Sequence, residues 1–379
     1  MPTESGIRAT RDKAQRIVST LITIDLDALT ANYRNFLASL APAHCAAVVK
    51  ADAYGLGITR IASTLHRAGC RQFFTATHRE GLALRALLPD AEVYVFEGVT
   101  AETAEAFCEH DLIPVLITPE QCGAWADRAR AEGARLPAVI DIDTGMTRLG
   151  FGERELRTLL SHPEHLDWLD LRYVMTHLAC ADDRSSAMVQ QQLQRFDRLR
   201  QLLPPAPTSI GNSAGALLGR GSAGDMVRLG LALFGGSPFL DGSQAAAQVL
   251  RVETRILQLR EITEPTPIGY GSTYTAASGT RIATVGTGYA DGYPWSLGNR
   301  GIAVIGGHRV PVVGRVSMDL ITLDVTGLPD ELVQPGCAVD LIGPEISLEE
   351  VAQRAGTINY EILTRLSQRA RRRYLGGAS

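Results

Sequence analysis

AAVVKADAYGLG, residues 46–57, is the stretch that decides the fold. An apolar run typical of a buried strand stops at Lys50, and a tyrosine and two glycines follow it. A lysine in this place can simply end a strand and extend its amine to water. A desolvated lysine can instead act as a nucleophilic amine that forms a Schiff base with a carbonyl group. The other strand ends must decide between these interpretations.

Eight apolar runs, each short enough for a buried strand, alternate with amphipathic segments. Segments 60–69 and 119–133 have the pattern of helices, and the second ends at Gly133. Repeated strand–helix units imply parallel strands, so the pattern predicts an α/β fold with a closed TIM-like (βα)8 barrel, and also allows seven or nine strands. The runs are 45–50, 72–77, 92–97, 112–117, 137–142, 171–177, 207–212 and 226–235.

The pattern of residue types changes after about residue 248, where glycine-rich, β-branched segments with turn signals predict a mostly antiparallel β domain. One helix, 347–356, is expected there, with Ser347 and Glu350 as a capping box. The basic tail QRARRRYLGG is interpreted as a solvated end. The predicted domains are a frayed leader (1–20), a barrel (21–248) and a C-terminal β domain (249–379).

Composition excludes several classes of protein. The 379 residues carry a formal net charge of -4, which does not favour nucleic acid as a partner. No run is long and apolar enough to span a membrane, and the first twenty residues lack the apolar centre of a signal peptide, so a cytoplasmic location is expected. The six scattered cysteines indicate reduced thiols rather than disulfides, and no metal site is expected.

Several strand ends carry polar groups that suit a common site. Besides Lys50, these are Arg148 after the fifth run, His177 at the sixth, the segment GNSAG (211–215) at the seventh and Arg228 in the eighth. Barrel enzymes place their chemistry at the C-terminal ends of the strands, and small residues such as those of GNSAG let backbone N–H groups approach an anion. Each signal alone is weak, but their common placement favours a site.

The chain resembles the alanine racemase family. The resemblance rests on VVKADAYGLG, DTGMTRLG, THLACAD, NSAG, MVRLGLALFG, IGYGSTY, VGTGYADGY, VGRVSMD and TINYEILTRL, in this order, and covers residues 24–366. It implies an enzyme that uses pyridoxal 5'-phosphate in a βα barrel followed by a β domain. The implied reaction interconverts L-alanine and D-alanine by two-base proton transfer on an external aldimine. The resemblance leaves open whether the enzyme supplies D-alanine for peptidoglycan precursors or serves alanine breakdown.

The resemblance also implies roles for individual residues. Lys50 matches the lysine that holds the cofactor and acts as one base, and Tyr270 matches the second base. Arg148 matches the residue that reaches the cofactor's phenolic oxygen and the substrate carboxylate, and Arg228 the arginine that faces the pyridine nitrogen. The other matches are Tyr54, Asn212, Ser213, Gly230, Leu231 and Tyr360 around the phosphate, His177 behind Arg228, Met318 and Tyr289 at the substrate, and Asp182, Arg315 and Ile358 at the entrance.

Two bases suit the reaction, because a proton must leave one face of Cα and another must arrive at the opposite face. Arg228 suits it too, since a guanidinium keeps its own proton and leaves the pyridine nitrogen unprotonated, which disfavours transamination. Tyr270 lies in the second domain; in the family this tyrosine enters the barrel of the other subunit. A homodimer with shared active sites is therefore expected.

Three positions depart from the family pattern. Asp141 stands where many members carry a carbamylated lysine that braces the substrate-binding arginine. Our hypothesis is that Asp141 braces Arg148 directly or through one water. Trp295 lies near the place of an entrance arginine, and Thr147 stands where glycine is common.

Other functions remain open from the sequence. A non-catalytic pyridoxal-phosphate protein on the same barrel would lack a second domain with YGSTY. A racemase of broader specificity, for example toward serine, would share every motif. A basic-amino-acid decarboxylase would have a carboxylate in place of Arg228 and a cysteine near the substrate, and Cys337 is a poor candidate in its polar turn. A cofactor-free Schiff-base aldolase would not need phosphate-binding residues.

Overall fold

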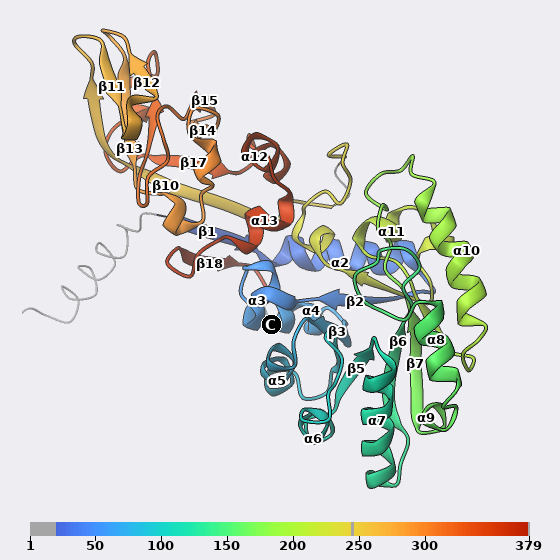
Figure 1. Cartoon of the computed structure of the whole chain (residues 1–379). Helices are drawn as coiled ribbons and strands as arrows, with labels where there is room; N and C mark the ends of the chain where they lie inside the picture. Colours follow the sequence, from blue (N-terminus) through green and yellow to red (C-terminus); the bar gives the residue numbers. More distant parts are fainter. Residues whose placement is uncertain (1–19, 244–245, 378–379) are drawn as a thin grey trace, which may run out of the picture. The chain divides into compact units, whose positions relative to one another are not determined.

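The protein forms two units, each with its own core. The structure, a computed structural model, describes residues 20–243 and 246–377 (Figure 1). Within these ranges, the barrel unit begins at Asp27 and ends at Gln248, and the sheet unit combines residues 20–26 with residues 249–377.

This division differs from the predicted domain limits at the N-terminal end of the barrel. The strand β1 (Thr20–Asp25) had been assigned to the barrel domain, but it pairs with strands of the sheet unit. The predicted frayed leader, residues 1–20, lies outside the described residues except for Thr20.

Eight parallel strands close into a barrel, as the eight apolar runs predicted. The last strand returns to the first, with Cys45 paired to Val227. Side chains of the strands fill the interior, where the buried Phe74 and Tyr94 stack with their ring centres 4.6 Å apart; Phe73, on the other face of β3, lies beside His66 of the surrounding helix layer. The strands are β2 (His44–Val48), β3 (Gln72–Thr75), β4 (Glu92–Val95), β5 (Leu112–Leu116), β6 (Leu136–Asp141), β7 (Leu169–Met175), β8 (Thr208–Ser209) and β9 (Met226–Leu229).

Helices follow the strands on the outside of the barrel (Figure 1). The predicted helix 119–133 shows why the chain folds this way: Thr118 caps its first turn, proline occupies its first position, and Gly133 ends it at φ 68°. The helices are α2 (Leu26–Leu40), α3 (Lys50–Tyr54), α4 (Ile58–Arg67), α5 (His78–Leu87), α6 (Ala104–Glu109), α7 (Pro119–Glu132), α8 (Glu153–Leu160), α9 (Glu164–Asp167), α10 (Met188–Arg200) and α11 (Ser213–Leu217), with short 3-10 turns η1 (Arg220–Ser222) and η2 (Leu231–Phe234).

The sheet unit is mostly antiparallel, as predicted. Its main sheet has the order β15-β14-β17-β10-β1-β18, with β13 paired to β10 and β16 paired to β13; β11 and β12 form a separate hairpin. The strands are β10 (Leu250–Glu261), β11 (Thr266–Ile268), β12 (Tyr274–Ala276), β13 (Arg281–Val285), β14 (Ile302–Ile305), β15 (His308–Pro311), β16 (Ile321–Asp324), β17 (Ala338–Ile342) and β18 (Arg371–Leu375).

The basic tail is largely exposed, in agreement with the prediction of a solvated end, but it is also a strand of this sheet, which the sequence did not indicate. Its residues form β18, parallel to β1, and Arg373 donates a hydrogen bond to Thr23 and lies 3.5 Å from Glu253. Alternate exposed positions and many charges suit a strand at the edge of a sheet.

Helical segments of the sheet unit include one that was predicted and one that was not. α12 (Leu348–Ala355) is capped by Ser347, but the Glu350 carboxylate binds Arg354 instead of completing a capping box. α13 (Asn359–Thr364) was missed. Four 3-10 turns complete the described part of this unit: η3 (Tyr270–Ser272), η4 (Tyr289–Asp291), η5 (Trp295–Leu297) and η6 (Asp330–Leu332).

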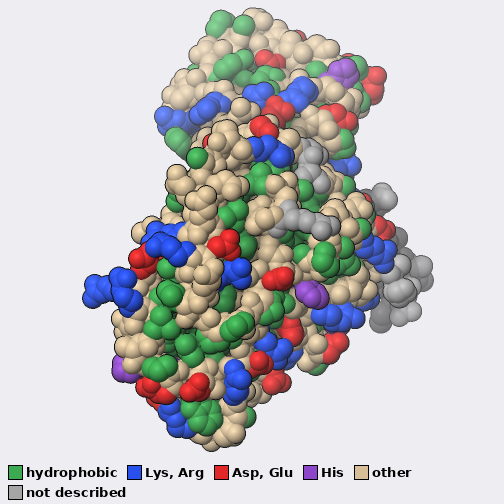
Figure 2. All heavy atoms as spheres, turned by 90° about the vertical axis from the view of Figure 1, so that its right-hand side faces the viewer, with side chains coloured by type: hydrophobic (Ala, Val, Ile, Leu, Met, Phe, Trp, Pro, Cys, Tyr) green, Lys and Arg blue, Asp and Glu red, His purple; other side chains and the backbone are tan. Residues whose placement is uncertain are grey.

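Acidic and basic side chains are interspersed on the face shown in Figure 2. Exposed pairs such as Arg198 with Glu153, at 2.6 Å, contribute little stability individually. All six cysteines are free thiols, as predicted, and Cys45, Cys70 and Cys122 are buried. Among the described residues, no helix is both long enough and apolar enough to cross a membrane.

Candidate functional site

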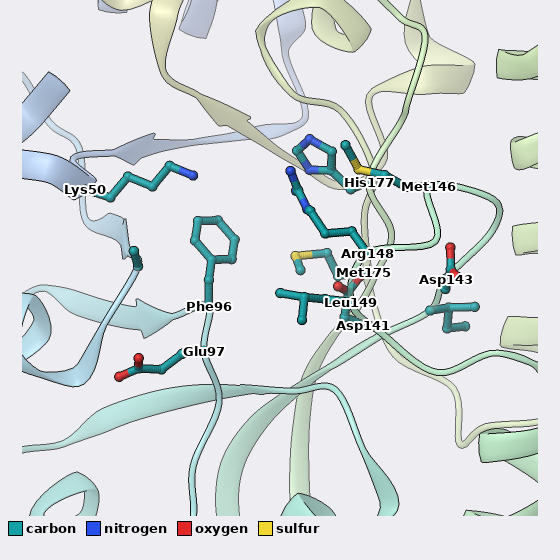
Figure 3. A pocket seen from close by; sticks show the side chains of 12 residues that line it. Lys50, Phe96, Glu97, Asp141, Asp143, Met146, Arg148, Leu149, Met175 and His177 are labelled. Atoms are coloured by element: carbon teal, nitrogen blue, oxygen red, sulfur yellow. The ribbon is translucent and has the colours of Figure 1, made fainter. Parts of the chain in front are cut away.

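A cavity of about 280 Å³ opens at the C-terminal ends of the barrel strands (Figure 3). Lys50, Arg148 and His177, three of the predicted site residues, all line it. The Lys50 amine and the Arg148 guanidinium point into the same space, with the Phe96 ring beside them. The parallel barrel therefore brings together side chains that are up to 127 positions apart in the chain.

Lys50 is followed by a left-handed helical turn without glycine. Ala51, Asp52, Ala53 and Tyr54 have φ of 53°, 55°, 53° and 58°. This conformation costs an L-residue roughly 1–2 kcal/mol, so four in succession need support from their surroundings. Backbone strain of this kind is typical of functional sites.

The Lys50 amine lies in a mostly apolar and cationic environment. Its Nζ is 5.6 Å from the centre of the Phe96 ring, which stacks on the buried Phe74. Burial lowers the pKa of Lys50, Arg148 lowers it further, and Glu80 opposes the shift. A larger fraction of the amine is therefore neutral near pH 7 than for an exposed lysine.

Arg228 is buried behind the cavity and is held by several acceptors. Its Nη1 donates to Ser209 Oγ at 2.7 Å, and its Nη2 donates to the Thr176 carbonyl at 2.8 Å and the Ile210 carbonyl at 3.2 Å. The Nε is also buried, but it has no hydrogen-bond partner in the structure. A buried N–H without an acceptor is costly, so this group suits a ligand acceptor.

His177 connects Arg228 to the cavity. Its Nδ1 lies 3.4 Å from Arg228 Nη2 and must accept, because a guanidinium only donates. Burial, reinforced by Arg228, Arg148 and Lys50, lowers the pKa of His177 to about 3. The imidazole is therefore neutral at working pH, with its proton on Nε2.

The predicted phosphate-binding residues of the barrel unit lie together. Ser213 Oγ accepts hydrogen bonds from the backbone N–H of Gly230, at 3.0 Å, and of Ala232, at 3.3 Å. Glycine at position 230 lets this loop lie close to Tyr54, because a Cβ there would stand 2.2 Å from the Tyr54 hydroxyl. Asn212 uses its side chain to cap α11 by accepting from Gly215 N–H, so it shapes this loop. Leu231 follows Gly230 as the first residue of η2.

This arrangement fits pyridoxal phosphate. A lysine at the cavity can form the Schiff base, the unpartnered Arg228 Nε can donate to a ring nitrogen, and the Ser213–Gly230 loop, which has no room for a side chain, can hold a phosphate. Lys50 is also the only lysine among the described residues, since the chain's other lysine is Lys13.

The direct form of the predicted bracing of Arg148 by Asp141 is wrong. No ion pair or hydrogen bond joins the two side chains, and in Figure 3 the Arg148 guanidinium points away from Asp141 toward His177. Asp141 is 8 % exposed, and its Oδ1 has no hydrogen-bond partner. Burial, supported by Asp143 and opposed by Arg228 and Arg148, raises the pKa of Asp141 to about 7.

We expect Asp141→Asn to remove a pH dependence of stability. The ordinary aspartate pKa is near 4, so between about pH 4 and about pH 7 the native state binds a proton that the unfolded state lacks, and wild-type stability falls as the pH rises. The asparagine variant lacks this slope, so its free energy of unfolding should rise relative to that of wild type by roughly 3–4 kcal/mol over this range. Urea unfolding at pH 4.5 and pH 8 measures the gain. A constant difference between the two proteins would contradict the expectation.

The remaining predicted residues of the sheet unit form exposed groups. Tyr270 is 72 % exposed on η3, and Arg315 lies against the same turn, because a Cβ at Gly271 would meet its Nη1 at 2.9 Å. The η4 turn of Tyr289 is bound to the Met318 segment, whose carbonyl accepts from Ala290 N–H. Also exposed are Met318, Ile358 and Tyr360 of this unit; Asp182 lies in the barrel unit, where its carbonyl accepts from Leu240 N–H.

Two residues near Lys50 were missed in the sequence. Phe96 lies at the end of β4 in the run EVYVFE, and strand-end position was the available signal. Glu80 binds the backbone N–H of Ala51, next to Lys50, at 2.7 Å. Its signal was the capping-box pattern of Thr77 and Glu80 directly after β3.

Comparisons with known proteins agree over most of the chain. Family models described as the N-terminal and C-terminal domains of alanine racemase match residues 24–238 and 249–374. An alanine racemase of Rhodospirillum rubrum is 44% identical over 360 residues, which cover 94% of this chain and 96% of the relative. A catabolic alanine racemase of Agrobacterium fabrum is 42% identical over 371 residues, covering 97% and 95%.

Among solved structures, the alanine racemase of Bartonella henselae, described as containing covalently bound pyridoxal phosphate, is similar with a TM-score of 0.91 and 38% identity. The match covers 94% of this chain and 100% of that chain. The biosynthetic alanine racemase of Pseudomonas aeruginosa gives a TM-score of 0.87 and 32% identity, covering 95% and 100%. Biosynthetic and catabolic enzymes are thus both among the similar proteins.

Proposed function

Because the chain belongs to the alanine racemase family, and is accordingly a pyridoxal-phosphate-dependent enzyme that interconverts L-alanine and D-alanine, we propose that Lys50 and Tyr270 are its two catalytic bases. The observation that carries the barrel half of this proposal is the placement of Lys50, the only described lysine, in one cavity with Arg148 and His177. Arg228 argues against a decarboxylase, which would need a carboxylate in its place.

Pyridoxal phosphate supplies the electron withdrawal that makes the Cα proton of a bound amino acid acidic. Lys50 would hold it covalently, the Ser213–Gly230 loop with Tyr54 would hold its phosphate, and Arg228 Nε would donate to its ring nitrogen. Arg228 has no proton to give at neutral pH, so the ring nitrogen stays neutral and the electron withdrawal stays moderate. This favours return of a proton to Cα over transamination.

Each proposed base meets a requirement of proton transfer. The Lys50 amine has a lowered pKa and can accept a proton near neutral pH. Arg148 extends a guanidinium into the same cavity, where it can bind the carboxylate of a small amino acid. Tyr270 would serve the opposite face of Cα as the second base, with Tyr289 and Met318 as further substrate contacts.

We further propose that the active enzyme is a homodimer in which Tyr270 serves the barrel of the partner subunit. Support comes from the sheet unit, where the aromatic and apolar residues that the resemblance places at the active site are exposed in the single chain, together with Trp295. The set comprises Tyr270 (72 % exposed), Ile358 (60 %), Trp295 (57 %), Met318 (53 %), Tyr289 (45 %) and Tyr360 (39 %). A cytoplasmic location is part of the same proposal, and six free thiols suit a reducing compartment.

A mixed dimer of Lys50→Ala and Tyr270→Phe chains tests the shared site. One of its two sites would combine an intact Lys50 with an intact Tyr270, so the dimer should have about half of the wild-type rate, while each pure variant dimer stays defective. The chains are coexpressed with different affinity tags, and the mixed dimer is purified through both. Failure to regain activity in the mixed dimer would place both bases in one chain, and failure to isolate any mixed dimer would refute the dimer itself.

A further inference from the structure

The turn after Lys50 is held by a carboxylate from the next strand–helix unit. Glu80 Oε1 accepts the backbone N–H of Ala51 at 2.7 Å, and Glu80 Oε2 accepts those of Ala76 at 2.8 Å and Thr77 at 3.3 Å. One side chain thus joins the end of β3 to the first residue of the left-handed turn. Hydrogen bonds to an ionised acceptor are stronger than neutral ones, which suits a strained segment.

A similar side-chain link occurs at another strand–helix junction of the barrel, where no lysine is present. On α7, Gln121 occupies the position that Glu80 has on α5: the side chain accepts the N–H of Ile117 at 3.0 Å, while its own backbone N–H is capped by Thr118. Its second side-chain atom, Nε2, donates to the Glu97 carbonyl of the preceding loop at 3.0 Å. A neutral amide side chain can therefore hydrogen-bond the start of a helix to the end of a strand and to a neighbouring loop.

What distinguishes Glu80 is its partner. Ala51, like the end of β3, presents a backbone N–H, so a side chain that links these two segments needs two acceptor atoms. A carboxylate has two acceptor oxygens, whereas an amide side chain has one. The residue that Glu80 fixes, Ala51, follows Lys50 directly in the chain. The Lys50 side chain has four rotatable carbons between the backbone and the amine. The turn that Glu80 holds therefore fixes the point from which this side chain leaves the backbone, and the amine at its end lies 5.6 Å from the centre of the Phe96 ring.

We propose that Glu80 is a positioning residue for Lys50, which holds the left-handed turn against the end of β3 and thereby fixes the place and charge environment of the amine. The inference rests on the proposed role of Lys50. It assigns Glu80 no contact with substrate or cofactor.

Three variants test it: Glu80→Ala, which loses every bond; Glu80→Gln, which keeps one acceptor; and Gln121→Ala, the matched control for a lost helix-to-loop tie. We expect Glu80→Ala to lower kcat roughly 10- to 100-fold, as a misplaced catalytic group does, with a smaller effect on KM. Glu80→Gln should recover part of the loss. Gln121→Ala should lose stability but stay within about twofold of wild type in kcat. All rates are compared at a temperature where circular dichroism shows each protein folded.

A second readout separates positioning from general stability. The full chain, labelled with ¹³C-lysine and freed of pyridoxal phosphate, has lysine signals only from Lys13 and Lys50. Loss of the Glu80 charge should lower the pKa of the Lys50 amine in both Glu80 variants, because that charge favours the protonated form, and Gln121→Ala should leave it unchanged. The proposal is overturned if kcat of Glu80→Ala matches that of Gln121→Ala, or if the Lys50 titration is the same in all variants. An inactive Glu80→Ala beside a fully active Lys50→Ala would instead refute the role of Lys50.

Discussion

Replacing Lys50 by alanine should reduce racemisation by about 10⁴-fold or more, because the change removes both the amine that holds the cofactor and a proton-transfer group. Lys50→Arg should be nearly as inactive, since a guanidinium keeps the charge but forms no Schiff base and releases no proton. The interconversion of L- and D-alanine, followed by optical rotation, measures the loss.

Lys13→Arg is the matched control, because it removes the only other lysine and should leave the rate unchanged. Borohydride treatment of the wild-type holoenzyme, followed by peptide mapping, should place the reduced cofactor on Lys50 and not on Lys13. An active Lys50→Ala enzyme, or a label on Lys13 alone, would remove the basis of the proposed mechanism.

Replacing Tyr270 by phenylalanine should slow proton exchange at Cα for one enantiomer of alanine much more than for the other. Only the phenol hydroxyl is lost, so the ring still fills its place, but proton exchange at Cα from the enantiomer that faces the phenol should fall by about 10²–10⁴-fold. Exchange from the enantiomer that faces Lys50 should persist. The experiment follows loss of the Cα proton by NMR in D₂O, starting separately from L-alanine and D-alanine.

Tyr274→Phe provides the control for Tyr270→Phe. Tyr274 lies four positions further on, and its hydroxyl is 3.4 Å from Asp324 within the sheet unit, so its loss should leave both exchange rates intact. If Tyr270→Phe exchanges both enantiomers at the wild-type rate, the two-base scheme would be falsified. An equal loss for both would indicate that the phenol orients the substrate rather than moving one proton.

The barrel was predictable because each strand carries its own signal. The runs around Phe73, Val93 and Val139 are apolar over the length of a buried strand, and the intervening segments have helix caps such as Thr118 and Gly133. The number and order of such units then determine the fold class. The common edge formed by parallel strand ends also placed Lys50, Arg148 and His177 in one site.

Two of the strands that escaped prediction, β1 and β18, depend on distant partners. β1 precedes the barrel in sequence, but its neighbour β10 begins more than two hundred residues later, and no local pattern indicates such a pairing. β18 is rich in arginine, and its strand conformation depends on its pairing with β1 and on partners such as Thr23 and Glu253. Propensity at such positions is overridden by tertiary contacts.

Within the site, the sequence indicated which residues belong together but not the direction of their side chains. Asp141 stands where the resemblance implies a group that braces Arg148, and this suggested a direct contact that the structure does not contain. Likewise, Ala51 to Tyr54 contain no glycine, so nothing local indicated positive φ. Both features depend on burial and on neighbouring units, which a linear pattern does not describe.

The turn at residues 51–54 has a consequence for chirality. At φ 53°, ψ 50° and φ 53°, ψ 54°, Ala51 and Ala53 have nearly the inverted dihedral angles of an ordinary α-helix. These are the angles at which a D-configured residue is relaxed and an L-configured one is strained. In a semisynthetic chain, D-alanine at these two positions would fit the native backbone without the steric cost that L-alanine has there. D-Alanine, a product of the enzyme, would thus fit these two positions of the enzyme's own chain better than L-alanine does.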